Sequence, residues 1–350
     1  MKRILIYTDT HFCQYSSIVR REAGKYSQRL KGLLDSINWA EKTASEKGCD
    51  TVVCLGDFFD KSHLNASELS ALQDIKWTDI PHYFIVGNHE MAESSLEISS
   101  VHVLNLISNV NVIEHSTMFK ETGADIIFLP YILEENRYKL SEYCQQLNST
   151  NRRVIFSHND ILGIQFGAYK SQTGFEIEDI KQNCDLFING HIHNGGWVET
   201  NWILNLGNLT GQNFSEDATK YSHQAMILNI PDNAEDSFTW EFYINPYAFN
   251  FYKIGLVTKP EDFPKFLHNS VVSCSCSEKN LALIREFLQN HPNVLEFRTI
   301  IDQSLNKLLP PEEQATRLQP VDHLALFHDK MAEIFGYDEI AMSEIERILA

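Results

Sequence analysis

Residues 51–60 read TVVCLGDFFD, a short apolar run followed by two aspartates. The first five residues are apolar or β-branched, which is typical of a strand that is buried in a parallel sheet. Asp57 follows this strand, at the edge where open α/β sheets place their ligand sites. Because a carboxylate has two oxygens, Asp57 can bind two metal ions there if other strand ends supply further ligands.

A strand and a helix precede this stretch. Residues 3–7 form an apolar run that ends at Thr8-Asp9-Thr10-His11, and residues 12–26 read as a loop. Residues 27–47 carry leucine, isoleucine and alanine at helical spacing, with Gly48 as the stop. A strand–helix–strand connection of this kind is right-handed and makes its two strands parallel. The sequence therefore predicts an α/β fold.

Several further strands are predicted to end in polar clusters. Short apolar runs predict strands at residues 82–86, 110–113, 125–129, 153–156, 185–188, 197–200, 202–206, 224–230 and 238–244, and helices are predicted at 66–76, 94–107 and 134–147. Three strand ends read Gly87-Asn88-His89-Glu90, Ser157-His158-Asn159-Asp160 and Gly190-His191-Ile192-His193. This recurrence of Asp, Asn and His is the strongest functional signal in the chain.

The C-terminal third changes character after Pro246. Residues 251–302 predict a small α/β unit, with strands at 251–257, 270–275 and 294–301 and helices at 261–268 and 278–290. Pro310-Pro311 breaks the chain, and residues 312–350 predict two helices with an apolar face. Such a helical pair usually docks onto a partner or onto its own protein.

The composition is that of a soluble globular protein of 350 residues, with 43% hydrophobic and 22% charged residues. The apolar run at the N-terminus ends at Thr8-Asp9, too short for a signal peptide, and no run is long enough for a membrane span. The seven cysteines are scattered and lack C-x-x-C spacing, which favours reduced thiols in a cytoplasmic compartment. A net charge of −18 argues against a broad basic surface for nucleic acid. Tight DNA binding would need metal ions, a small basic patch or a partner.

The polar strand ends supply a set of candidate metal ligands: Asp9, His11, Asp57, Asn88, His158, His191 and His193. Oxygen and imidazole ligands without thiolate suit Mn²⁺, Fe²⁺, Zn²⁺ or Mg²⁺. The set suits two adjacent metals that share Asp57 and a bridging water. Two metals can clamp the attacking and leaving oxygens of an in-line phosphoryl displacement, and they lower the pKa of the water so that it becomes the nucleophile.

The motifs D-x-H, G-D-x-x-D, G-N-H-E, a lone strand-end His and G-H-x-H occur in this order across residues 9–193. Together they resemble the calcineurin-like metallophosphoesterase superfamily, whose fold is a four-layer αββα sandwich. By analogy, the first metal takes Asp9, His11, Asp57 and His193, and the second takes Asp57, Asn88, His158 and His191.

Two further roles follow from the same resemblance. His89 resembles the superfamily's general acid, which protonates the leaving alkoxide or orients the scissile phosphate. Asp60 resembles the carboxylate that steadies a ligand imidazole. The alternative for Asp60 is an ordinary turn or capping residue.

Within the superfamily, the layout resembles the manganese-dependent nuclease subunit of the SbcCD and meiotic-recombination repair complexes, phage recombination endonucleases included. The resemblance implies a nuclease domain at 1–247, a capping domain at 248–309 and a helical segment at 310–350 that binds an SMC-like ABC ATPase. One departure is that His11-Phe12-Cys13 stands where this family usually has a small Leu-Gly pair.

Several assignments keep a second interpretation. Arg20, Arg21 and Lys25 could contact a DNA backbone or belong to an ordinary solvated loop. Asn208 could belong to a loop that closes over the site or to a simple turn. The helices at 66–76 and 94–107 resemble a dimer-forming bundle, although core packing explains their apolar positions equally well. The remaining histidines lie in no motif and are expected at the surface or as satisfied core residues: His63, His82, His102, His115 and His223.

Three functions are therefore compared. The first is a DNA exonuclease or endonuclease subunit of a recombination and repair complex, which works with an ATPase partner. The second is a stand-alone phosphodiesterase or phosphatase that acts on a small molecule or a protein, which the acidic charge favours. The third, a scaffold without activity, is disfavoured because every ligand position is filled.

Overall fold

The computed structural model describes residues 1–19, 22–166 and 169–302. Residues Met1–Ile300 form one compact unit. The two helices predicted at 312–350, and the basic residues Arg20 and Arg21, lie outside the described residues. No helix among the described residues is long and apolar enough to cross a membrane.

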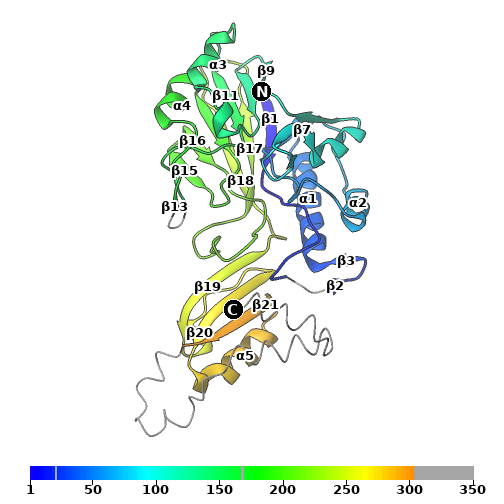
Figure 1. The fold of residues 1–350 in the computed structure, drawn as a ribbon, viewed down its shortest axis with the longest axis vertical. Coiled ribbons are helices and arrows are strands. Elements are labelled where there is room, and N and C mark those ends of the chain that lie inside the picture. The colour runs from blue at the N-terminus through cyan, green and yellow to red at the C-terminus, as the bar shows by residue number, and fades with distance from the viewer. Residues whose placement is uncertain (20–21, 167–168, 303–350) are drawn as a thin grey trace, which may run out of the picture. The chain divides into compact units, whose positions relative to one another are not determined.

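Two six-stranded sheets form the body of the unit (Figure 1). The first sheet has the order β18-β17-β1-β4-β5-β8, with bounds Thr239–Ile244, Gln224–Ile230, Lys2–Tyr7, Thr51–Cys54, His82–Ile85 and Val110–Ile113. The second has the order β15-β16-β14-β11-β10-β9, with bounds Gly196–Glu199, Ile203–Asn205, Leu186–Asn189, Arg153–Ser157, Asp125–Leu129 and Thr117–Lys120. In each sheet the central strands are parallel.

Helices cover the outer face of each sheet. α1 (Gln28–Glu46) and α2 (Ala66–Leu72) lie against the first sheet, and α3 (Leu140–Gln146) and α4 (Ile177–Asn183) lie against the second (Figure 1). One buried cluster fills the space between the sheets, where Ile4, Val53 and Phe156 meet. The predicted four-layer αββα sandwich is therefore confirmed.

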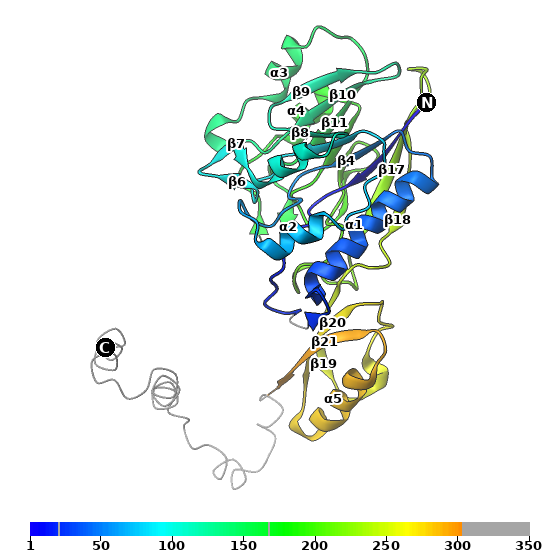
Figure 2. The ribbon, with the colours of Figure 1, turned by 90° about the vertical axis from the view of Figure 1, so that its right-hand side faces the viewer.

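The predicted β1-α1-β4 unit sets the geometry of the site. β1 and β4 are parallel, with Leu5 opposite Val52, so both strands end at the same edge. Ser27 caps α1 by accepting a hydrogen bond from the backbone N–H of Leu30, which satisfies a free donor of the first turn. Figure 2 shows α1 running along the first sheet.

A small α/β unit follows the two sheets in the chain. Its sheet consists of β19 (Asn250–Val257), β20 (Ser270–Cys276) and β21 (Val294–Ile301), and α5 (Leu281–Asn290) packs on it through Ile284 and Leu288. The chain boundary at 247/248 stays a prediction. Cys274 and Cys276 are buried in β20, and all seven cysteines are free thiols, as the sequence predicted.

Three of the predicted helices are wrong in part, each for a local reason. The helix predicted at 94–107 is instead the second strand of a hairpin and a 3₁₀ helix. The hairpin pairs β6 (Met91–Ala92) with β7 (Ser95–Ser99), and η1 (Ser100–Leu106) follows it. Glu93 and Ser94 both have positive φ, which is the backbone of a tight hairpin turn. The short helix predicted at 261–268 is only the 3₁₀ turn η3 (Pro260–Asp262), because Pro264 cannot continue it.

The helix predicted at 134–147 divides at its centre. Its first part is the 3₁₀ turn η2 (Glu134–Asn136), and α3 begins only at Leu140. The carboxylate of Asp179, from α4, accepts hydrogen bonds from the backbone N–H groups of Leu140 and Ser141 and so caps α3 from another helix. The remaining short elements are η4 (Glu278–Asn280) and the two-residue strands β2 (Glu22–Ala23), β3 (Tyr26–Ser27), β12 (Gln165–Phe166) and β13 (Tyr169–Lys170).

Candidate metal centre

The predicted ligands meet at the carboxyl edge of the two facing sheets. They follow five parallel strands, one after another: Asp9 and His11 after β1, Asp57 after β4, Asn88 after β5, His158 after β11, and His191 and His193 after β14. Among the described residues, three groups of side chains converge closely enough to hold an ion: Asp9 with His11 and His193, Asp57 with His158 and His191, and His11 with Asp57 and His89. The first two, called the first and second group below, each join residues that the motifs assigned to one metal, whereas the third was not predicted as a ligand set. The metal-binding roles themselves stay predictions.

In the first group, three side chains converge on one point. Nε2 of His11 lies 3.0 Å from Nε2 of His193 and 4.0 Å from Oδ1 of Asp9. Nε2 of His193 lies 3.8 Å from the same oxygen. The opposite nitrogens face carboxylates, with His11 Nδ1 3.2 Å from Asp60 Oδ1 and His193 Nδ1 2.8 Å from Glu216 Oε1.

The second group has a similar arrangement. Nε2 of His158 lies 3.1 Å from Oδ2 of Asp57, and Nδ1 of His191 lies 2.9 Å from Oδ1 of Asn88. Nε2 of His191 faces outward, 3.3 Å from Oδ1 of Asp160. Asn88 thus takes its predicted place beside this group.

Asp57 links the two groups. Its Oδ2 lies 3.1 Å from His158 Nε2 in one group and 3.9 Å from His11 Nε2 in the other. Its Oδ1 accepts a hydrogen bond from the backbone N–H of His89 at 3.0 Å, which fixes the orientation of the carboxylate. The geometry is that expected of a carboxylate shared by two cations.

The residues present fit a pair of cations, because lone pairs face one another at both positions. Nδ1 of His158 donates to the carbonyl of Leu55 at 2.7 Å, so a neutral ring turns the lone pair of Nε2 towards the Asp57 carboxylate. Oδ1 of Asp9 and Nε2 of His158 are buried and have no hydrogen-bonding partner. Buried acceptors that lack a donor are costly, and a cation resolves that cost. When bound, two divalent cations would polarise a phosphoryl group and activate a water molecule.

Burial and the close approach of charged groups shift the pKa values of the side chains in the site. Burial alone would lower the pKa of His158, but the Asp57 carboxylate raises it to about 9. Burial would likewise raise the pKa of Asp57, yet His158 and its neighbours lower it. The pKa of His193 is raised to about 9 because its hydrogen bond to Glu216 outweighs burial, whereas burial lowers the pKa of His11. Protons and cations therefore compete for the same nitrogen lone pairs.

The backbone is strained where it presents these side chains. Asp9, His11, Asp57 and His191 have φ values of 50°, 48°, 48° and 67°, in the left-handed region that side chains with a Cβ rarely adopt. Strain of this kind is held at functional sites by the surrounding structure.

Glycines allow the loops to approach one another. Gly56 has a φ of 110°, and a Cβ there would lie 2.4 Å from Nδ1 of His158. A Cβ on Gly87 would lie 2.2 Å from Oδ1 of Asp57. The glycines of G-D-x-x-D and G-N-H-E therefore leave room for the ligands of neighbouring loops.

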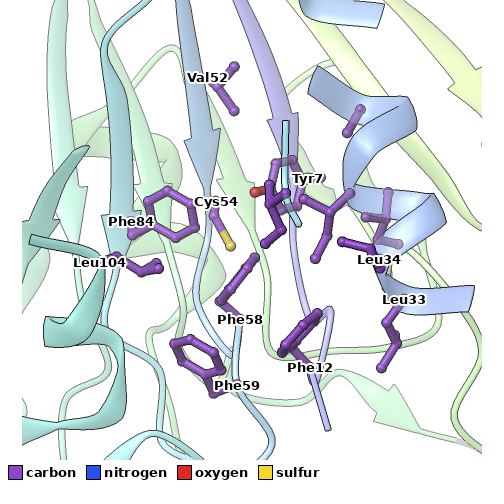
Figure 3. Packing of buried hydrophobic residues seen from close by; sticks show 14 of the residues in the cluster. Tyr7, Phe12, Leu33, Leu34, Val52, Cys54, Phe58, Phe59, Phe84 and Leu104 are labelled. Carbon is purple, nitrogen blue, oxygen red and sulfur yellow. The ribbon is translucent and has the colours of Figure 1, made fainter. Parts of the chain in front are cut away.

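The loop at 56–60 is anchored in the core by Phe58 and Phe59, as Figure 3 shows. Their rings meet edge to face at 4.8 Å, and the ring of Phe12 stacks on Phe58 at 5.9 Å. The backbone N–H of Phe12 also donates to the carbonyl of Phe58 at 2.7 Å. The departure at His11-Phe12-Cys13 is therefore a packing feature, because Phe12 is buried beneath the ligand loops.

His89 differs from the candidate ligands by its exposure to solvent. Its Nδ1 lies 3.2 Å from the carbonyl oxygen of Asp60, and its ring meets that of His11 edge to face at 4.7 Å. An exposed imidazole beside the two groups can reach a bound substrate, which suits the predicted role of general acid. Asp60 contacts His11 through its side chain and His89 through its backbone, as the predicted steadying role requires.

Sequence reasoning did not assign three buried or half-buried acids at the site. Glu216 and Asp160 face the outer nitrogens of His193 and His191. Glu90 accepts hydrogen bonds from the backbone N–H groups of Phe59 and Gly87, so it ties the G-D-F-F-D loop to the G-N-H-E loop. Burial and the nearby Asp57 raise the pKa of Glu90 to about 8. Asp160 and Glu90 stand within the quoted clusters, but nothing in the sequence around Glu216 signals its position.

The structure also places the residues for which the sequence left two interpretations open. Lys25 is exposed and its ammonium lies 3.0 Å from a carboxylate oxygen of Asp74, so its contact with DNA stays a prediction. Asn208 donates a hydrogen bond to Oε2 of Glu216 at 2.8 Å, which joins its loop to the site. His82 and His223 are buried core residues, whereas His102 and His115 reach solvent beside Glu114.

The chain matches the calcineurin-like phosphoesterase family over residues 2–195, and it belongs to that family. Family membership indicates a metal-dependent phosphoester hydrolase, and the two side-chain groups described above are candidate ligand sets for its metals. No protein with a curated description matches the chain significantly.

Several solved structures are similar in fold. A dimetal phosphatase from Danio rerio has 16% identity and a TM-score of 0.44, over 70% of this chain and 96% of that one. The purple acid phosphatase PPD1 from yellow lupin, Lupinus luteus, has 11% identity and a TM-score of 0.44, over 70% and 51%. The calcineurin-like phosphoesterase YfkN from Bacillus subtilis has 11% identity and a TM-score of 0.36, over 70% and 90%. These similarities are too distant to carry an argument about substrate.

Proposed function

We propose that this chain is a dinuclear-metal phosphodiesterase and the DNA nuclease subunit of an SbcCD-like recombination and repair complex. One observation carries the phosphodiesterase part: Asp57 joins two groups of lone pairs beside an exposed imidazole. The nuclease part is supported by the G-D-F-F-D motif and by the small α/β unit that follows the two sheets. The proposed cation is Mn²⁺.

Each side chain of the site would have its own role in the proposed reaction. The seven candidate ligands would hold the two cations, and Asp57 would set their separation. His89 would protonate the leaving alkoxide, or hold the scissile phosphate in line, from its solvent-facing position. Asp60 would keep His11 oriented, because its carboxylate accepts from the outer nitrogen of that ring.

A partner would supply what the chain lacks for DNA. The net charge of −18 opposes a duplex, because DNA affinity depends on neutralising phosphates. An SMC-like ATPase, docked on the segment from 310 to 350, would provide the basic surface. The same charge favours the second function, a stand-alone phosphatase or phosphodiesterase that acts on a small or protein substrate.

The two functions are separated by one assay. The protein with Mn²⁺ is incubated with linear duplex and single-stranded DNA, with and without a candidate ATPase, and in parallel with chromogenic phosphodiesters. We expect cleavage of DNA and of the esters, and loss of both when a chelator removes the cations. Intact DNA under every condition, beside rapid turnover of the small esters, would contradict the nuclease proposal and support the second function.

A further inference from the structure

We infer that Glu216 is a positioning residue, which fixes the tautomer and orientation of His193 and thereby the affinity of the first cation position. The inference rests on the proposed function, because it assumes that a cation is held by His193. Neither the motifs nor the family match, which ends at residue 195, includes Glu216.

The carboxylate of Glu216 is saturated with donors. Its Oε1 lies 2.8 Å from Nδ1 of His193, and its Oε2 accepts from the backbone N–H of Gln212 at 2.6 Å and from the amide of Asn208 at 2.8 Å. The side chain is only 1% exposed. The amide of Asn213 is a fourth donor, 3.3 Å from Oε1. Four donors around a buried carboxylate favour its ionised form and fix its orientation.

His193 needs this support more than its neighbour does. The side chain of His11 is 2% exposed, whereas that of His193 is 27% exposed. An imidazole that is partly open to solvent can rotate about its Cβ–Cγ bond, and its proton can move from one ring nitrogen to the other. Because Glu216 accepts the Nδ1–H of His193, the lone pair of the neutral ring is on Nε2, the nitrogen that faces Asp9 Oδ1.

Glu216 is itself fixed by its loop. The backbone N–H of Leu209 donates to the carbonyl of Thr8 at 2.9 Å, beside the end of β1. The N–H of Ala218 donates to the carbonyl of Phe251 at 2.7 Å, in β19. The loop is therefore bonded at one end to the ligand-bearing sheet edge and at the other to the small α/β unit, which keeps the carboxylate in place before any cation binds.

The test compares two buried glutamates that each face a histidine. Glu216→Gln replaces the acceptor next to His193, and Glu41→Gln makes the same change in the buried pair of Glu41 with His82, outside the site. Binding of Mn²⁺ alone is measured by calorimetry and by electron paramagnetic resonance on the full chain. We expect the parent and Glu41→Gln to bind two ions with a spin-coupled signal. Glu216→Gln should bind one ion about 10- to 100-fold more weakly and give an uncoupled signal.

The outcomes are distinguishable. Two ions bound with unchanged affinity by Glu216→Gln would overturn the inference and leave the proposed function standing. Fewer than two ions bound by the parent would overturn the proposed function itself. If Glu216→Gln does not fold, ¹⁵N-histidine spectra of the Zn²⁺-loaded parent decide the question. A proton on Nδ1 of His193 supports the inference, and a proton on Nε2 overturns it.

Discussion

The pairs Glu41–His82 and Glu216–His193 contain the same residue types, and both glutamates are 1% exposed. In the first pair every polar atom has a complementary partner. Nε2 of His82 faces both carboxylate oxygens of Glu41 at 3.0 Å. Its Nδ1 lies 2.8 Å from the carbonyl oxygen of Ile80 and 3.2 Å from the amide nitrogen of Asn109, so that nitrogen has a partner whether or not it carries a proton. The N–H and hydroxyl groups of Thr78 complete the acceptors of Glu41.

The second pair leads into the candidate metal centre. Nδ1 of His193 is bonded to Glu216, but Nε2 faces Nε2 of His11 and an oxygen of Asp9, which are themselves acceptors. The two pairs are therefore alike in residue type and in the burial of the glutamate, whereas the His82 side chain is fully buried and that of His193 is 27% exposed. What distinguishes the candidate metal centre is that several acceptors, Nε2 of His11 and His193 and Oδ1 of Asp9, face one another.

Among the substitutions that test this difference between the two pairs, Asp57→Ala should have the largest effect on cation binding and turnover. Because Oδ2 of Asp57 lies beside a nitrogen of each group, the variant should lose both cations and all detectable phosphodiester turnover. His11→Ala is the matched control and should weaken mainly one cation. Metal content after dialysis, measured by atomic emission, checks both variants. One cation retained by Asp57→Ala would show that the carboxylate is not shared.

A smaller effect is expected from His89→Asn. Both cations should stay bound, because His89 is exposed, its Nδ1 faces the backbone carbonyl of Asp60, and each of the first two groups is complete without it. Turnover of a phosphodiester with a poor leaving group should fall about 100-fold, as expected for the loss of acid–base assistance. Steady-state kinetics beside metal analysis provide the measurement. Loss of a cation from this variant would make His89 a ligand and reject the role of general acid.

The smallest effect on the metal centre is expected from Glu41→Gln. The substitution disturbs a buried, fully bonded carboxylate, so the free energy of unfolding should fall by about 1–3 kcal/mol. Urea unfolding with and without Mn²⁺ measures this loss. The stabilisation that Mn²⁺ confers should equal that of the parent. A reduced Mn²⁺ effect would mean that the two pairs do not differ in the way described above.

The convergence of the candidate ligands could be predicted from the sequence because each of them directly follows a short apolar strand. Parallel strands bring such residues to one edge whatever the lengths of the intervening segments, so Asp9, Asp57 and His158 needed no knowledge of the loops. The α/β class followed from the same strands and from α1, whose apolar spacing is a local signal, whereas the four-layer sandwich followed from the resemblance to the superfamily.

The residues behind the ligands could not be predicted in that way. Glu216 reaches His193 through a loop whose course depends on hydrogen bonds to β1 and β19, and no local pattern encodes those bonds. The helix prediction for residues 94–107 was wrong for a related reason. Its apolar residues suit helical spacing, but the left-handed turn at Glu93 and Ser94 determines a hairpin.

The left-handed backbone at Asp9, His11, Asp57 and His191 lowers the stability of the fold, yet the site needs the side chains of these residues. A glycine at His191 would relieve roughly 1 kcal/mol of backbone strain and would also remove an acceptor from the crowded group. A laboratory selection for heat resistance without divalent cations would therefore favour variants that have lost the site. The same selection in the presence of Mn²⁺ would retain it, because cation binding then contributes to the stability that is selected.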